Sequence, residues 1–172
     1  MRTLETRYAL ALFELTQDEE GLRAGAELLM GDQNLWEALN TPCIPREEKD
    51  KVLCRLLEGK TSPALLNFFR LLCRRERFSL LPAIEEKYHQ LKLKQEGGAQ
   101  ALFRCARQPD PADLARIGEA LKKRHGLSKV EFHVELDPEV LGGFVIQLEG
   151  ITYDKSVRGV LRGLRRSLKE RE

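Results

Sequence analysis

The sequence predicts a mainly α-helical protein, with an N-terminal six-helix bundle followed by a small α+β domain that contains a β-hairpin. Three observations predict this fold. Apolar residues recur at helical spacing through roughly the first hundred residues. Gly97-Gly98 interrupts that pattern, and strict alternation of apolar and polar residues first appears after it, over 130–136. A chain of 172 residues is long enough for two small domains, which we expect at 1–98 and 99–172.

The helices of the first domain are predicted from their apolar faces and from the residues that begin or end them. Ser62 is an expected N-cap with a proline at the first helical position after it, and Pro45 is expected to be the first residue of another helix. Short loops favour an antiparallel bundle. The expected helices are 3–16, one begun by Asp18 and ended by Gly31, a short one through Leu35, Trp36 and Leu39, one from Pro45 to Gly59, 62–75 and 80–95.

The first and fifth of these helices are apolar on more than one face. One interpretation is that an exposed apolar groove between them receives an amphipathic helix of a partner. The other is that both helices are buried on all sides, and the pattern alone favours this second interpretation. The faces that would point outward carry Leu4, Tyr8, Ala11 and Leu15 in the first helix, and Ala64, Phe68 and Leu71 in the fifth.

The second domain is predicted to alternate strands and helices. A short strand is expected within 99–107, although its alternation is poor, and a helix over 113–126. Alternation predicts a half-buried strand over 130–136, and the turn Glu149-Gly150 predicts a hairpin between strands 144–148 and 151–153. The final helix, capped by Asp154 or Ser156, has an apolar face of Val157, Val160, Leu161, Leu164 and Leu168.

The sequence contains no pattern typical of a catalytic, cofactor-binding or metal-binding site. Nucleotide-binding glycine motifs are absent, and the four cysteines include no Cys-x-x-Cys pair. We therefore expect no enzyme activity, no cofactor and no metal. Apolar runs fall short of the roughly 20 residues that cross a bilayer. The first residues lack the apolar core of a signal peptide, which indicates a cytoplasmic protein.

The final helix concentrates positive charge, although the net charge of the chain is only +2. Three interpretations remain open: a solvated face, which is favoured, a surface for an acidic protein partner, or a nucleic-acid-binding module. No aromatic residues are interleaved, which weakens the last of these. The cations are Lys155, Arg158, Arg162, Arg165, Arg166, Lys169 and Arg171.

Three segments together resemble a known family. The first is Arg7-Tyr8-Ala9-Leu10-Ala11-Leu12-Phe13, and the second is Asn67-Phe68-Phe69-Arg70-Leu71-Leu72, followed by Arg77 and Leu80-Leu81-Pro82. The third runs from Asp137-Pro138 through Gly142-Gly143-Phe144 to Asp154-Lys155-Ser156-Val157-Arg158-Gly159. Their order and spacing resemble the delta subunit of bacterial ATP synthase, whose mitochondrial counterpart is the oligomycin sensitivity-conferring protein.

The resemblance implies a non-catalytic stator subunit of F-type ATP synthase on the cytoplasmic face of the bacterial cell membrane, held there through the complex. Its first domain would bind the N-terminal helix of an alpha subunit, and its second the C-terminal helices of the b subunits. The joint would resist rotor torque during proton-driven ATP synthesis. Tyr8, Ala11 and Leu71 match positions of the alpha-subunit groove, and Leu15 and Phe68 follow by helical spacing.

The same resemblance assigns a signature to the second domain, which we expect to shape the fold and thereby the stalk-docking surface. The glycine pair would permit an unusual backbone entry into the hairpin. A nucleic-acid-binding module that uses the basic final helix is the alternative function. The signature residues are Asp137, Pro138, Gly142, Gly143, Asp154, Ser156 and Arg158.

Overall fold

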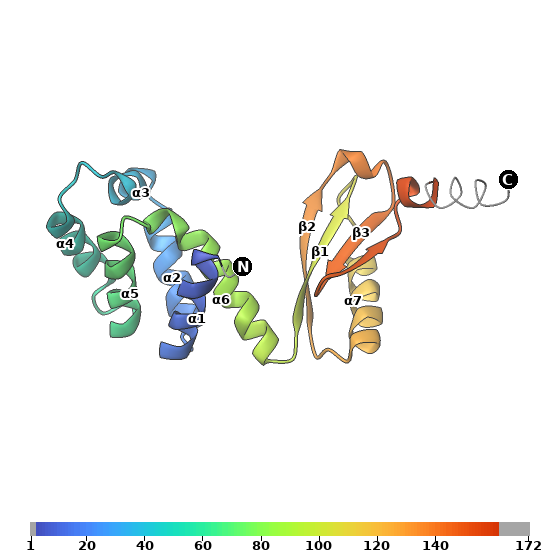
Figure 1. Ribbon diagram of the computed structural model, residues 1–172, viewed down its shortest axis with the longest axis horizontal. Coiled ribbons are helices and arrows are strands. Elements are labelled where there is room, and N and C mark those ends of the chain that lie inside the picture. The colour runs from blue at the N-terminus through green and yellow to red at the C-terminus, as the bar shows by residue number, and fades with distance from the viewer. Residues whose placement is uncertain (1–2, 162–172) are drawn as a thin grey trace. The chain divides into compact units, whose positions relative to one another are not determined.

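The computed structural model describes residues 3–161, in which a run of helices is followed by a small sheet with one helix packed against it, as Figure 1 shows. None of the described helices is long and apolar enough to cross a membrane. The chain divides into two compact units, Met1–Lys92 and Leu93–Glu172, here called the helical unit and the sheet unit. The elements are α1 (Leu4–Leu15), α2 (Glu19–Met30), α3 (Gln33–Asn40), α4 (Arg46–Leu57), α5 (Pro63–Arg74), α6 (Leu81–Gln95), β1 (Ala99–Cys105), α7 (Pro111–His125), β2 (Val130–Leu136), β3 (Phe144–Leu148) and β4 (Ile151–Asp154).

The helices begin close to the predicted positions because capping side chains fix their first turns. Asp18 Oδ1 accepts a hydrogen bond from the Gly21 amide at 2.8 Å, and Ser62 Oγ accepts one from the Leu65 amide at 3.5 Å. The prediction for Pro45 is wrong by one position. Pro45 is extended and lies at the N-cap, so that α4 begins at Arg46. The final helix begins at Val157, and its residues from Arg162 onward, Leu164 and Leu168 included, lie outside the described part of the chain.

One apolar core holds the helical unit together. Each of α1 to α6 contributes fully or nearly fully buried side chains, with Ala9 and Leu12 of α1 lying against the same cluster as Phe69 and Leu72 of α5. Trp36 of α3, the single tryptophan of the chain, packs against Phe78 with ring centroids 5.5 Å apart. Its fluorescence therefore reports on this core.

A buried lysine closes the end of α3. Only 5% of Lys49 is exposed, and its ammonium donates hydrogen bonds to the backbone carbonyls of Leu39 at 2.9 Å and Thr41 at 2.6 Å. The last carbonyls of a helix have no partner within the helix, and they carry the negative end of its dipole. Lys49 satisfies these groups from α4 and so ties the two helices together.

Ion pairs join α4 to α5 at the surface. Arg70 donates to Asp50 Oδ2 through Nε at 3.1 Å and Nη2 at 2.8 Å, and Arg74 donates to the same oxygen at 3.1 Å. The hydrogen bonds from Arg70 outweigh partial burial and hold the pKa of Asp50 below its ordinary value. This carboxylate therefore stays charged at neutral pH.

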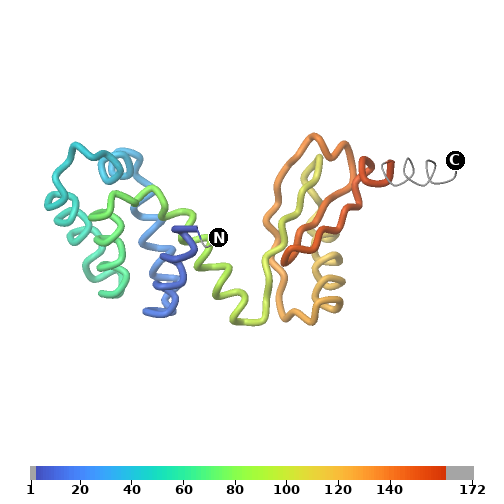
Figure 2. The backbone as a smooth tube through the Cα atoms, viewed as in Figure 1, coloured from blue at the N-terminus to red at the C-terminus, as the bar shows by residue number. Residues whose placement is uncertain are grey.

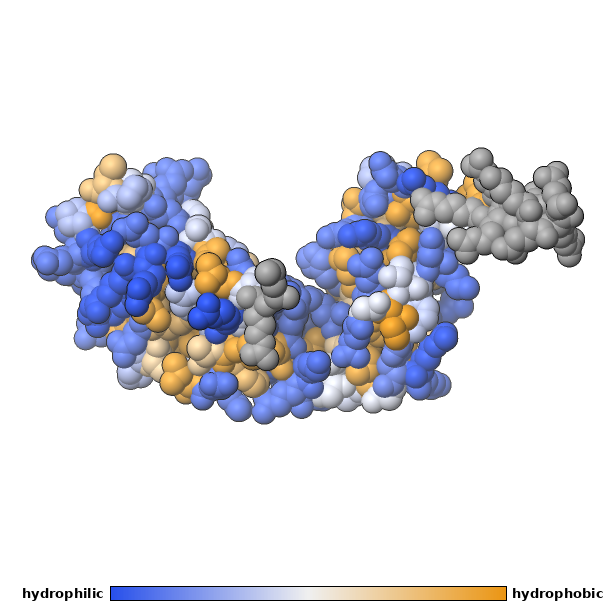
Figure 3. Space-filling model, viewed as in Figure 1, coloured by the Kyte–Doolittle hydropathy of each residue, from blue (hydrophilic) through white to orange (hydrophobic). Residues whose placement is uncertain are grey.

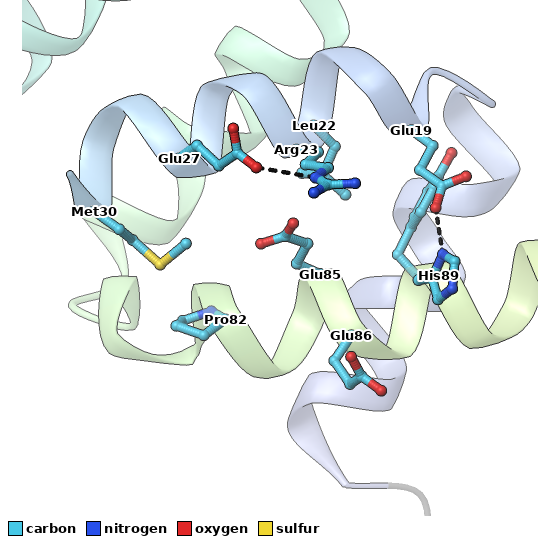
Figure 4. A pocket seen from close by; sticks show the side chains of 10 residues that line it. Glu19, Leu22, Arg23, Glu27, Met30, Pro82, Glu85, Glu86 and His89 are labelled. Atoms are coloured by element: carbon cyan, nitrogen blue, oxygen red, sulfur yellow. Dashed lines mark hydrogen bonds and ion pairs between the residues drawn. The ribbon is translucent and has the colours of Figure 1, made fainter. Parts of the chain in front are cut away.

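Polar contacts join α6 to the end of α1 and to α2, and a small cavity lies between α2 and α6. The Tyr88 hydroxyl donates to the Thr16 carbonyl at 2.7 Å, and His89 Nδ1 lies 2.5 Å from Glu19 Oε1. Between α2 and α6 is a cavity of about 400 Å³, into which the Glu85 carboxylate points (Figure 4). Burial disfavours the charged form and raises the pKa of Glu85 above its ordinary value.

The described strands form one mixed sheet with the order β2-β1-β3-β4, whose path Figure 2 traces. The poorly alternating segment is the central strand, β1, which pairs in parallel with β2 and antiparallel with β3. Its alternate residues Ala99, Ala101, Phe103 and Cys105 are buried. The predicted hairpin between β3 and β4 is confirmed, with Glu149 and Gly150 in its turn.

Strand β2 is less buried than its alternation predicts. The Phe132 ring lies beside Gly118 of α7, where an added Cβ would sit 3.3 Å from the ring. Beyond this contact Val134 is 37% exposed and Leu136 is 61% exposed. The prediction of a half-buried strand over 130–136 therefore holds only for its first half, where Val130 and Phe132 pack against the core of the sheet unit.

We expect Lys49→Met to lower the free energy of unfolding of the helical unit by about 1–3 kcal/mol, since it leaves the carbonyls of Leu39 and Thr41, at the end of α3, without their buried donor. The measurement is urea unfolding followed by Trp36 fluorescence. Lys51→Met, at an exposed position of the same helix, is the matched control. Equal stability of the two variants would contradict this role of Lys49.

We expect Glu85→Gln to stabilise the helical unit at neutral pH by less than about 1 kcal/mol, because it removes a partly desolvated charge. A raised pKa means that the folded state holds the proton more tightly than the unfolded state does. The gain should therefore shrink as the pH falls through the raised pKa of folded Glu85, and it should be lost below the ordinary value of 4.5, where wild-type Glu85 is neutral in both states. Trp36 fluorescence in urea at several pH values measures it, with the exposed Glu14→Gln as control. A gain that does not change with pH would refute this assignment.

Candidate docking surfaces

Tyr8 of α1 lies at the boundary between the core and the outer surface of the helical unit. Its ring meets Phe68 of α5 edge-on, with centroids 6.4 Å apart. Arg77 donates a hydrogen bond from Nη1 to the Tyr8 hydroxyl at 3.0 Å, and its guanidinium carbon lies 6.0 Å from the ring centroid. These contacts fix the ring in one orientation. Sequence reasoning quoted Arg77 only as part of a motif and missed this positioning role.

The remaining positions of the predicted groove divide between surface and core. Leu15 is 75% exposed, Leu71 is 42% exposed, and Ala11 is also exposed. Phe68 is only 7% exposed, so it supports Tyr8 from beneath and does not belong to the outer surface. The alternative that both helices are buried on all sides is therefore wrong. Figure 3 shows hydrophobic residues gathered on the helical unit below the place where Figure 1 labels α1.

In the sheet unit, the glycine pair allows the chain to pass close to its own backbone. Gly143 has φ +72°, and a Cβ there would lie 2.3 Å from the Lys155 carbonyl oxygen. The Gly142 carbonyl accepts a hydrogen bond from the Val157 amide at 3.0 Å, and the Phe144 carbonyl accepts one from the Lys155 amide at 2.9 Å. A side chain at Gly143 would force these segments apart.

The Asp154 side chain organises the start of the final helix. Its Oδ1 accepts hydrogen bonds from the Ser156 amide at 2.9 Å and the Ser156 hydroxyl at 2.6 Å. Ser156 Oγ in turn accepts from the Gly159 amide at 2.9 Å, so Ser156 is the residue that caps the helix. Arg158 pairs with Glu139 at 3.3 Å on the surface.

Part of the signature converges on one small hollow of about 210 Å³. Asp137, Asp154, Ser156 and Arg158 line it together with Arg104 and Glu139. Asp137 Oδ1 accepts from the Glu139 amide at 2.9 Å, and Pro138 begins the short 3₁₀ turn that follows. The structure thus brings these residues together through turns and caps, which are contacts that shape the backbone.

Leu141, which lies within the third segment of the family resemblance, stands out beside these turns. It is 72% exposed and adopts φ +60°, a left-handed conformation that leucine rarely takes. Since its side chain is held outward at some conformational cost, the turn presents an apolar group to solvent. The sequence carries no signal for this backbone conformation.

Metal-binding clusters and reactive thiols were two further possibilities for a site among the described residues. No group of three or more His, Cys, Asp or Glu side chains within 3–161 is placed to hold a metal ion. Burial raises the pKa values of the Cys73 and Cys105 thiols, which disfavours the reactive thiolate. In the cavity of Figure 4, Glu19 and His89 are paired with each other.

Known proteins are similar to this chain along nearly its whole length. The ATP synthase subunit delta of Leptospira interrogans is 33% identical over 171 residues, covering 96% of this chain and 90% of the relative. The same subunit of Synechococcus sp. strain RCC307 is 31% identical, with 98% and 97% covered. A chain in the cryo-EM structure of the Toxoplasma gondii mitochondrial ATP synthase hexamer shares the fold, with a TM-score of 0.73, 19% identity and coverage of 96% and 97%.

A family model described as ATP synthase delta (OSCP) subunit matches residues 4–168, which includes both units and all three segments that carry the resemblance. Together with the relatives above 30% identity, this match establishes the family. The chain belongs to the ATP synthase delta (OSCP) subunit family.

Proposed function

We propose that this chain is the non-catalytic stator subunit of an F-type ATP synthase and works as a mechanical joint. Residues 1–98, with α1–α6 as a six-helix bundle, bind the N-terminal helix of an alpha subunit on the catalytic head. Residues 99–172 bind the C-terminal helices of the b subunits in the peripheral stalk. The chain has no active site or cofactor of its own, and it reaches the cytoplasmic face of a bacterial membrane only through the complex.

The observation that carries this proposal is the outward apolar row of α1 on a chain of this family. Leu4 is 40% exposed and Leu15 75% exposed, although α1 also sends Ala9 and Leu12 into the core. A helix that is apolar on a solvent-facing side is typical of a surface that binds another helix. Tyr8, fixed by Phe68 and Arg77, supplies a rigid aromatic anchor in this row.

The proposed joint needs slow dissociation. Rotor torque would turn the catalytic head unless the stator held it, so the contact must persist under load. Burying an aromatic ring with several aliphatic side chains contributes several kcal/mol, at roughly 25 cal/mol per Å² of apolar area. Differences in affinity between related interfaces lie mostly in the dissociation rate. An apolar contact is also screened little by salt.

The nucleic-acid alternative finds little support among the described residues. Of the basic residues predicted for the final helix, only Lys155 and Arg158 lie within 3–161, and Arg158 is paired with Glu139. Binding to nucleic acid would weaken steeply as salt rises. The apolar joint proposed here predicts almost no salt dependence, so one titration at two salt concentrations separates the two functions.

We expect Ala11→Asp to weaken binding of the cognate alpha-subunit N-terminal peptide at least tenfold, because it places a charge inside an apolar contact. Calorimetric titration of the full chain with the peptide measures this at two salt concentrations. Wild type should bind one to one with a negative heat-capacity change.

The matched control is Ala24→Asp, the same substitution at an exposed position of α2. It should bind the peptide as wild type does, and Trp36 fluorescence should show both variants folded. Unchanged affinity of folded Ala11→Asp would refute the assignment of this surface.

A further inference from the structure

We propose that the hollow between α7 and the sheet is the stalk-binding site of the sheet unit. It receives the apolar face of an acidic amphipathic helix from a b subunit. This inference rests on the proposed function and adds to it the face that docks. It is carried by an apolar hollow, the exposed Leu136 at the end of a row of residues beside it, and the charge around its mouth.

The hollow has a volume of about 480 Å³ and an apolar floor. Phe103 of β1 and Phe144 of β3 lie nearly parallel within it, with ring centroids 5.2 Å apart and planes at 23°. Ile117 and Ala120 of α7 form the facing wall. The volume suits several apolar side chains, and the aromatic floor is fixed by strand pairing before any partner arrives.

The apolar surface extends from this hollow across the end of the sheet. Cys105 of β1 lines the hollow and pairs with Leu136 on one side and Phe144 on the other, so these three residues form a row on one face. Leu136 at the end of the row is 61% exposed. Three strands span about 10 Å, which matches the diameter of an α-helix. The row thus carries the apolar surface from the hollow to the exposed Leu136, within the width of one bound helix.

The rim of the hollow is positively charged on balance. Arg107 is exposed and has no carboxylate partner within residues 3–161. Arg116 pairs with Asp113 at 3.4 Å, but their side chains are 83% and 64% exposed, so this pair contributes little and can be exchanged for another carboxylate. Two arginines against one aspartate favour a partner with acidic residues beside its apolar face.

A helix fits these features better than an extended segment does. The row lies on the face of the sheet, where side chains and not backbone groups are presented, and α7 already packs on this face as a helix. Apolar side chains one turn apart on the partner would enter the hollow and cover Leu136. Acidic side chains on its flank would then meet Arg107 and Arg116. Apolar contact gives the affinity, while the arginines set the orientation.

The test is titration of the full chain with the soluble part of the cognate b subunit. Ala120 is exposed but lines the hollow, so Ala120→Asp should keep the fold and weaken b binding at least tenfold. Ala115→Asp, on the opposite exposed face of α7, is the matched control and should bind like wild type. Arg107→Glu, an exposed charge reversal, should weaken binding at low salt and less at high salt.

Each variant is also titrated with the alpha-subunit peptide, which should bind unchanged. If wild type, Ala120→Asp and Arg107→Glu all bind the b subunit equally well, the hollow is not the binding site of the b subunit, and the stator function stands. If wild type does not bind the b subunit at all, the stalk half of the proposed function fails, and this inference fails with it. Should Ala120→Asp prove unfolded by circular dichroism, Arg107→Glu alone decides, because its side chain lies at the surface.

Discussion

The edge-on contact between Tyr8 and Phe68 joins the core of the helical unit to its outer surface, and the proposed head-binding surface depends on it. Phe68 is fixed by the core, and Tyr8 is fixed by Phe68 and by the hydrogen bond from Arg77. A ring held on both sides loses little further freedom on binding, so more of its apolar contact appears as affinity. Weakening the core beneath Phe68 would therefore loosen the docking surface even without any change to a residue that the partner touches.

Helix positions followed from the sequence because their causes are local. Asp18 and Ser62 each cap a helix through the amide three positions further on, so the pattern alone locates them. Burial could not be predicted in the same way. The segment of β1 shows little alternation, although as the central strand it pairs with a neighbour on each side. Leu136 belongs to a strictly alternating strand, yet it is exposed and lies outside the core of the sheet unit.

The candidate sites show the same difference between local features, which the sequence predicts, and contacts between distant residues, which it does not. The apolar pattern alone favoured burial of both helices, whereas Leu15 and Leu71 are exposed. Neither the pattern nor the resemblance could show that Phe68 lies beneath Tyr8. The positioning role of Arg77 could not be predicted, because its hydrogen-bond partner, Tyr8, is far away in the chain. The hollow beside α7 could not be predicted either, since it forms only where strands β1 and β3 and a helix meet.

Gly143 bears on how surfaces of this family are compared. Any Cβ at this position would strike the Lys155 carbonyl, so the fold itself forbids other residues whether or not a partner is present. Gly143 also lines the hollow that we assign to the stalk. An evolutionary map of the sheet unit would mark this glycine as constrained for backbone reasons alone. The fold leaves exposed positions such as Ala120 and Arg107 free to vary. Conservation at such positions would therefore indicate selection by a binding partner.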